Sequence, residues 1–395
     1  MEYEAIFGGP PNIQVTITPA GTGTPPTSAT YAVDRADFDA QPMYHQVAMF
    51  FRNGGGVCYI VSIDPGDITR GIGTLKAEDE PTLLLVPGAP LTAYNDMLQH
   101  CKDRKDRFAI LDAPLTRAAT GSLSDMTLFR GAVNSALEYG AAYTPHLITD
   151  MSVQDDWVEV VEEGSGTNAD QPKGKLHTLK GAASDEDRRH YLAIKERVSS
   201  NTIILPPSGA IAGLYARIDR ERGVWKAPAN AGLIGVIAPT VKISDEEQMG
   251  LNVDAGSHKS INAIRSFPGR GTLVWGARTL AGNSGEWKYV NVRRLFIMIE
   301  ESIQKATQFA VFEPNTASTW IKVKTMIEGF LFNLWQQGAL AGAKPEHAYY
   351  IKVGLNVTMT AQDILDGIMR VDVGIAAARP AEFIILRFSH KLQES

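Results

Sequence analysis

The sequence contains only two cysteines, Cys58 and Cys101, among its 395 residues. Because they lie in unrelated local contexts, they predict neither a disulfide framework nor a C-x-x-C metal site. The sequence also lacks any apolar run approaching the ~20 residues that a helix needs to cross a bilayer. Its start, MEYEAIFGG, has neither the basic nor the apolar region of a signal peptide. We therefore expect a reduced, intracellular site of folding and no direct membrane insertion.

A basic excess is missing as well. Lysine and arginine total 38 against 44 aspartate and glutamate residues, which gives a net charge of -6. Nucleic-acid binding normally needs a basic surface, so this balance argues against a nucleic-acid partner. Trp287 and Tyr289 near Arg293 and Arg294 could stack on and neutralise a nucleic acid. Pairing of these arginines with protein carboxylates is the favoured interpretation.

Catalytic and cofactor motifs are also lacking. The eight histidines are scattered without an H-x-x-x-H pair, and no G-x-S-x-G or P-loop is present, so we predict no metal, no cofactor and no catalytic residue. The glycine-rich stretch FPGRGTLVWGARTL instead predicts a turn at Pro268–Gly269 followed by a strand. Adjacent carboxylates at Glu300 and Glu301 are expected to be solvated or salt-bridged. The rival class is a subtilisin-like serine hydrolase with Ser208 as nucleophile, although Ser208 is also a credible helix N-cap.

The first half of the chain reads as α/β. Near-continuous apolar strands separated by helices predict a sheet covered on both faces. The expected strands are 12–18, 57–63, 82–88 and 107–114, and the expected helices are 43–52, 94–105 and 125–139. From 150 to 205 an acidic opening and a Gly/Ser/Asn/Pro-rich middle predict an inserted, exposed hairpin or lobe with a helix near its end.

The second half is richer in helices. A helix is expected to start at Ser208 and to end in a basic turn before Gly223. Two amphipathic helices follow at 292–309 and 320–338, then a strand at 348–353 and a short helix near Thr360. One face of the first amphipathic helix carries Val292, Leu295, Phe296, Ile299, Ile303 and Ala306.

The chain ends in an unusual strand signal, EFIILRF, which is apolar on both faces. A terminal strand of this kind is either a central strand of its own sheet or an edge that pairs with another chain. Both readings stay open on the pattern alone. The residues concerned are Glu382, Phe383, Ile384, Ile385, Leu386, Arg387 and Phe388.

Long ordered motifs from Ser208 onward closely resemble the sheath protein of contractile phage tails and related injection systems. They include SGAIAGLYARIDRERGVWKAPAN, INAIRSFPGRGTLVWGARTL, EWKYVNVRRLFIMIEESI, VFEPN, TWIKVKTMIEGFLFNLWQQGALAGA and GIAAARPAEFIILRF. Upstream, YEAIFGGP, FFRNGGGVCYIVSI and RFAILDAP also resemble the family, whereas 150–205 resembles only a variable insertion.

The resemblance implies a multi-domain chain of class α/β plus α+β. Residues 1–75 would be an N-terminal remnant of a family segment. Residues 76–265 would form a middle α/β domain similar to subtilisin but non-catalytic, with the insertion at 150–205. Residues 266–395 would form a compact α+β C-terminal domain that faces an inner tube. Family members usually begin with a strand arm and a further stretch ahead of the segment similar to MEYEAIFGG, so a shortened or mis-started copy and an arm supplied otherwise are both open.

The resemblance also implies partners and sites. Such subunits stack as hexameric rings around an inner tube protein, between baseplate and terminal cap proteins, and shorten together to drive the tube through a target envelope. The last strand, 382–388, would complete a sheet in a neighbouring subunit. Assembly would take place in the bacterial cytoplasm, for a phage tail or an injection particle. The implied tube-attachment residues on the helix before the last strand are Gln362, Asp363, Asp366 and Arg370.

Overall fold

The computed structural model describes residues 2–20, 28–33, 42–63, 66–117, 126–164, 170–252 and 254–382. The chain forms two compact units. Unit 1 comprises Met1–Arg217 and Ala229–Asn283, and unit 2 comprises Ile218–Pro228 and Ser284–Ser395. The boundary expected at 265/266 falls inside a strand of unit 1, and the chain passes finally into unit 2 after Asn283.

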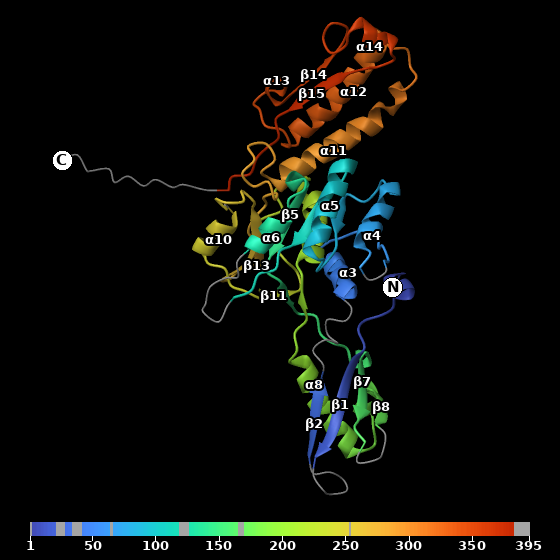
Figure 1. Ribbon diagram of the computed structural model, residues 1–395, viewed down its shortest axis with the longest axis vertical. Coiled ribbons are helices and arrows are strands. Elements are labelled where there is room, and N and C mark those ends of the chain that lie inside the picture. Colours follow the sequence, from blue (N-terminus) through green and yellow to red (C-terminus); the bar gives the residue numbers. More distant parts are fainter. Residues whose placement is uncertain are drawn as a thin grey trace, which may run out of the picture. The chain divides into compact units, whose positions relative to one another are not determined.

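Unit 1 is built on a six-stranded sheet with the order β10-β13-β12-β5-β4-β3 (Figure 1). Strands β3, β4, β5 and β12 run parallel, and β13 and β10 continue the sheet antiparallel. The bounds are β3 Leu83–Leu85, β4 Phe108–Asp112, β5 Gly140–Thr144, β12 Ile261–Phe267, β13 Gly271–Val274 and β10 Ala231–Gly232. Every residue of β4 and β5 is buried, which confirms the expectation of a sheet covered on both faces.

Helices cover both faces of this sheet. Side chains alternate along a strand, so positions 140 and 143 of β5 face opposite sides of the sheet and meet different helices. A Cβ at Gly140 would collide with Leu98 of α5, whereas Tyr143 shares a 2.6 Å hydrogen bond between hydroxyls with Tyr215 of α9. The helices of this part are α1 Glu2–Phe7, α3 Pro42–Arg52, α4 Ile68–Thr74, α5 Leu91–Arg104, α6 Thr127–Ala132, α9 Ser208–Arg222 and α10 Asp245–Asn252. A second small sheet has the order β11-β6-β9, with β11 Val236–Pro239, β6 Leu147–Thr149 and β9 Ile204–Leu205.

The insertion at 150–205 contains the expected hairpin and helix, but it does not fold alone. Its strand β7 pairs in parallel with β1 near the start of the chain, which gives a four-stranded sheet of order β2-β1-β7-β8. Helix α8 lies beside β2 (Figure 1), and the hydroxyl of Tyr31 in β2 is 2.9 Å from Nδ1 of His190 in α8. The bounds are β1 Ile13–Ala20, β2 Ser28–Val33, β7 Val158–Glu162, β8 Gln171–Lys175, α7 Leu176–Lys180 and α8 Asp185–Ser199.

Three local predictions have different outcomes. The turn at Pro268–Gly269 is confirmed: it joins β12 to β13, and Gly269 and Gly271 adopt φ values of 72° and 73° that favour glycine. The predicted buried strand at 57–63 is wrong for this structure, because the segment is extended without strand pairing and Val57 is 91% exposed. The expected helix 125–139 is also shorter, since α6 ends at Ala132.

Unit 2 packs two long helices against a two-stranded sheet. Both helices expected from the 3.6-residue pattern are present, as α11 and α12, and their apolar faces form one buried core with Leu295, Ile299, Val323, Ile327 and Leu331. The bounds are α11 Val290–Ala306, α12 Ala317–Gln336, α13 Pro345–Ala348, β14 Tyr349–Val353, α14 Ala361–Leu365 and β15 Val371–Ile375. Within the described ranges, no helix has the length and apolarity to span a bilayer.

Candidate functional site

The serine proposed as a nucleophile is buried against a carboxylate. Ser208 begins α9, is 0% exposed, and donates from its hydroxyl to Asp112 Oδ2 at 2.8 Å. Its backbone N–H donates to Asp112 Oδ1, also at 2.8 Å, and the Gly88 N–H donates to Oδ2 at 3.3 Å. The neighbouring Gly209 N–H donates to Gln46 of α3. Asp112 therefore binds the start of α9 from the end of β4, where an anion is favoured by the helix dipole.

This arrangement replaces the predicted capping role of Ser208. Its hydroxyl donates outward to Asp112, whereas an N-cap side chain would accept from the helix N–H groups. Burial raises the pKa of Asp112 to about 6, while hydrogen bonds from Ser208 and Gly88 act in the opposite direction. A serine hydrolase needs an imidazole to take the hydroxyl proton and an accessible serine. Ser208 meets neither need in the described structure, so the contact stabilises the fold of unit 1.

The adjacent arginines of α11 pair within unit 2, as the sequence favoured. Arg294 donates to both carboxylate oxygens of Asp219, with a distance of 2.9 Å from Nη1 to Oδ1. The Arg293 guanidinium lies 4.6 Å from the centre of the Trp287 ring and 3.7 Å from the Glu300 carboxylate. Both arginines are almost fully buried, so these side chains do not form a basic surface for nucleic acid.

The small sheet of unit 2 ends after two strands in the described chain. Strands β14 and β15 are antiparallel, with Tyr349 opposite Ile375 and Val353 opposite Val371, and neither pairs with a third described strand. A two-stranded sheet is marginal by itself and gains stability from added strands or from packing on helices. Strand β15 was not predicted from the sequence, although the apolar residues Val371, Val373 and Ile375 alternate with Asp372 and Gly374 as in a strand.

The four residues expected at the tube-attachment helix lie together around α14. Thr360 and Asp363 form a capping box, and Arg370 donates to Asp363 Oδ1 from Nη2 at 3.0 Å. The hydrogen bonds from Thr360, supported by Arg370, lower the pKa of Asp363 to about 2. Gln362 donates to Asp366 at 2.8 Å. Asp363 and Arg370 therefore hold the local structure, while Gln362 and Asp366 lie exposed on it.

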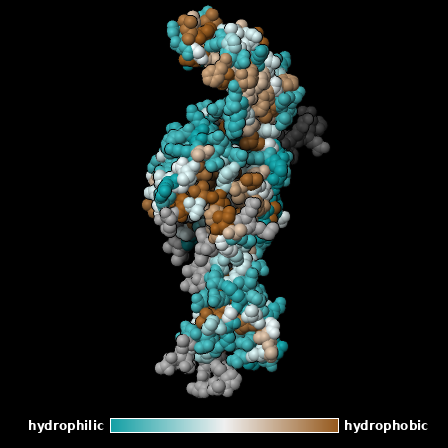
Figure 2. Space-filling view, turned by 90° about the vertical axis from the view of Figure 1, so that its right-hand side faces the viewer, coloured by the Kyte–Doolittle hydropathy of each residue, from teal (hydrophilic) through white to brown (hydrophobic). Residues whose placement is uncertain are grey.

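Exposed apolar residues accompany these polar groups, and the sequence reading missed them. Leu365 of α14 is 80% exposed, and Val357 in the loop before α14 is 62% exposed. Leu355 and Ile368 add smaller exposed areas. Figure 2 shows hydrophobic side chains gathered at the end of unit 2 that carries α14. Exposed apolar groups of this kind mark interaction surfaces, so contacts at α14 need not be only polar.

The segment expected to pair with a neighbouring subunit lies almost entirely outside the described residues. Phe383, Ile384, Ile385, Leu386, Arg387 and Phe388 follow the last described residue, Glu382. The Glu382 carboxylate accepts a 3.1 Å hydrogen bond from the Tyr289 hydroxyl, and the Ala378 carbonyl accepts one of 3.2 Å from the Asn291 side chain. The described chain is thus held to the start of α11 just before the segment begins.

Comparison with known proteins gives two adjoining matches to family models. The phage tail sheath protein central domain matches residues 64–280, and the phage tail sheath C-terminal domain matches residues 283–391. The tail sheath protein of Burkholderia phage BcepMu is 28% identical over 205 residues, which are 49% of this chain and 43% of that protein. The tail sheath protein of Vibrio phage KVP40 is 28% identical over 188 residues, which are 47% of this chain and 26% of that protein. The chain therefore spans less than half the length of these curated relatives.

Solved structures match over more of the chain. The PVC sheath complex of an extracellular contractile injection system, in its contracted state, has a TM-score of 0.67 and 34% identity. That match covers 89% of this chain and 80% of the other. A chain of the anti-feeding prophage baseplate has a TM-score of 0.65 and 34% identity, and covers 88% and 80%. The mixed α/β, multi-domain architecture is therefore similar to sheath structures across both units.

Proposed function

This chain belongs to the phage tail sheath family, and we propose that it is a structural subunit of a contractile sheath. The observation that carries the proposal is the match of both sheath domains in chain order, over residues 64–280 and 283–391. Subunits would assemble as stacked hexameric rings around an inner tube protein, between a baseplate and a terminal cap. Contraction would drive the tube through a target envelope. The role is structural, so no catalytic residue or cofactor is needed.

We propose that neighbouring subunits are joined by shared strands. The apolar segment 382–388 begins at Glu382, which accepts a hydrogen bond from Tyr289, and the β14–β15 sheet has edges without a described partner strand. Backbone hydrogen bonds across such a junction hold two subunits together regardless of side-chain sequence. The segment that connects the shared strand to its own subunit can change direction while these bonds persist. Rigid units can then shift against one another during contraction without separating, provided that their packing has two stable arrangements.

The strand junction can be tested by assembly. The full chain is expressed with its tube protein, and rings or tubes are counted by negative-stain electron microscopy. Deleting residues 380–395 is expected to abolish assembly while leaving a folded subunit, because the shared strand is lost. Deleting only residues 391–395 is the matched control and is expected to assemble. Normal tubes from the longer deletion would refute strand donation, and persistent monomers of the unaltered chain would refute the sheath role.

We further propose that the surface around α14 contacts the inner tube, through Gln362 and Asp366 together with Leu365. A lysine at 365 would place a charge into an apolar contact, so Leu365→Lys is expected to give sheath without tube. Leu192→Lys is the matched control, because Leu192 is also exposed, at 66%, but lies on α8 of unit 1. Co-sedimentation of tube and sheath measures the effect. Equal tube retention by both variants would contradict this placement of the tube contact.

A further inference from the structure

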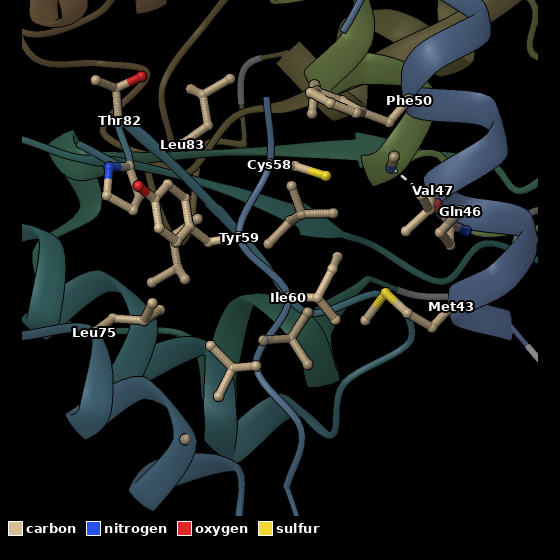
Figure 3. A pocket seen from close by; sticks show the side chains of 18 of the residues that line it. Met43, Gln46, Val47, Phe50, Cys58, Tyr59, Ile60, Leu75, Thr82 and Leu83 are labelled. Atoms are coloured by element: carbon tan, nitrogen blue, oxygen red, sulfur yellow. Dashed lines mark hydrogen bonds between the residues drawn. The ribbon is translucent and has the colours of Figure 1, made fainter. Parts of the chain in front are cut away.

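A cavity of about 530 Å³ lies in unit 1 between the extended segment 57–63 and the edge of the six-stranded sheet. We call residues 57–63 the strap. Figure 3 shows Cys58, Tyr59 and Ile60 of the strap, Leu83 of β3 and Met43 of α3 around this space. Apolar side chains dominate its walls, and α9 contributes only the small residues Gly209, Ala212 and Ala216. The space is therefore bounded by a sheet edge on one side and a β-prone segment on the other.

The sheet edge that faces the cavity is incomplete. Strand β3 pairs through Leu83–Leu85 with Phe108–Ile110 of β4, and no other described strand pairs with β3. In a parallel sheet that is covered on both faces, an edge of this kind exposes backbone donors and acceptors. Leu83, Leu84 and Leu85 are each at least half-buried, so the edge lies among apolar groups rather than in open solvent.

The strap is an apolar segment that pairs with no described strand. It consists of Val, Cys, Tyr, Ile, Val, Ser and Ile, which are mostly residues that favour strands. Nevertheless Val57 is 91%, Tyr59 45% and Ile63 39% exposed. In Figure 2, hydrophobic side chains gather on the face of unit 1 that carries α3 and α4. A hydrogen bond from the Tyr59 hydroxyl to Glu80, just before β3, and contact of Ile63 with Gly71 of α4 hold the strap to the segments that lead into β3.

The topology leaves one place for this chain. Strands β3 and β4 are parallel and joined by α5, and crossovers of this type are right-handed. If the strap paired with β3 in parallel, α4 would be the corresponding crossover helix, and it would have to lie on the same face as α5. Helix α4 does lie beside α5, where the Thr69 hydroxyl donates to Asp96 at 2.6 Å. Helix α4 thus already occupies the position of a crossover helix, although the strap that precedes it is not paired with β3.

We propose that the strap closes onto β3 and extends the sheet by a further parallel strand, so that the open form seen here alternates with a closed one. Closure satisfies the exposed backbone groups of β3, fills the cavity with the strap's own side chains and removes Val57 from solvent. The alternative occupant of the same edge is a strand from a second copy of the chain. The two occupants are distinguished by whether the new contact lies within one chain or between chains.

Disulfide trapping tests the closed form on the full-length chain. Cys58 of the strap is exposed and serves as the native thiol. Paired residues on neighbouring strands bring Cα atoms to about 5 Å, within the range that a disulfide bridges. Cysteines are introduced singly at Leu83, Leu84 and Leu85, and mild oxidation is followed by mass spectrometry of unreduced peptides. We expect at least one position to form a disulfide with Cys58 within the same chain, because oxidation traps the closed form whenever it is populated.

The same substitutions in a Cys58→Ser background are the matched control and are expected to show no such peptide. Hydrogen exchange of the unaltered chain provides a readout that does not depend on substituting buried leucines. Closure is expected to slow the strap amides by about 100-fold or more relative to an unstructured peptide. Exchange at the unstructured rate without an intramolecular disulfide would overturn the proposal. Disulfides that form only between two chains would also overturn it, because they assign the β3 edge to a second copy.

Discussion

The burial of Asp112 against Ser208 predicts how the free energy of unfolding depends on pH. Burial raises the pKa of Asp112 from 3.8 to about 6. Between these values the folded protein binds the proton more tightly than the unfolded chain does. The stability that the protonated carboxyl contributes is therefore complete below about pH 4 and is lost as the pH rises through about 6. At 1.36 kcal/mol per pKa unit, the change in the free energy of unfolding is about 3 kcal/mol.

Substitution Asp112→Asn keeps the shape of the side chain but removes its titration. We expect the free energy of unfolding of the variant, minus that of the unaltered protein, to rise by about 2.4 kcal/mol between pH 4 and pH 7, which is most of the full change. Urea titrations at several pH values, read by pulsed hydrogen exchange in peptides from β4, report on unit 1. Asp103→Asn, an exposed change on α5, controls for the loss of one negative charge. Stability curves of the Asp112→Asn variant and the unaltered protein that stay parallel across this range would refute the reasoning.

Three further predictions concern unit 2. Leu331→Ala, at a core residue with 0% exposure, is expected to lower the free energy of unfolding by about 2–5 kcal/mol. Leu365→Ala, at an exposed residue, should change it by less than about 0.5 kcal/mol. Urea unfolding compares the two variants, and equal effects would contradict the assigned core. Asp219→Asn is expected to cost about 2 kcal/mol because it weakens a charged hydrogen-bond pair with the nearly buried Arg294; an unchanged urea midpoint would speak against that. Thr360→Ala removes the capping hydrogen bonds of α14 and should speed amide exchange at 361–366 about fivefold, for a loss of about 1 kcal/mol. The amides of α12 should exchange at an unchanged rate. Equal acceleration in α14 and α12 would argue against a local role of the Thr360 cap.

Local patterns were sufficient for the elements whose causes lie within a few residues. The apolar spacing from Val292 to Ala306 predicts α11, because a helix buries residues three and four apart on one face. The turn before β13 follows from Pro268 and Gly269, because their backbone preferences act locally. The pairing of Arg294 with a protein carboxylate was foreseen as a class, since an acidic chain offers many partners. The identity of that partner, Asp219, was not.

What only the tertiary structure decided is which distant segments meet. The parallel pairing of β1 with β7 joins residues about 145 positions apart, and Ser208 meets Asp112 across 96 positions. Neither contact leaves a periodic signal, because each depends on which distant segment lies opposite and not on the local sequence alone. The strap at 57–63 shows the same limit: its residues favour a strand, but in this structure it forms no backbone ladder with the edge of β3 nearby. The sequence by itself determined the long amphipathic helices α11 and α12, the turn before β13 and the family, and the fold decided which edges, faces and buried charges the elements share.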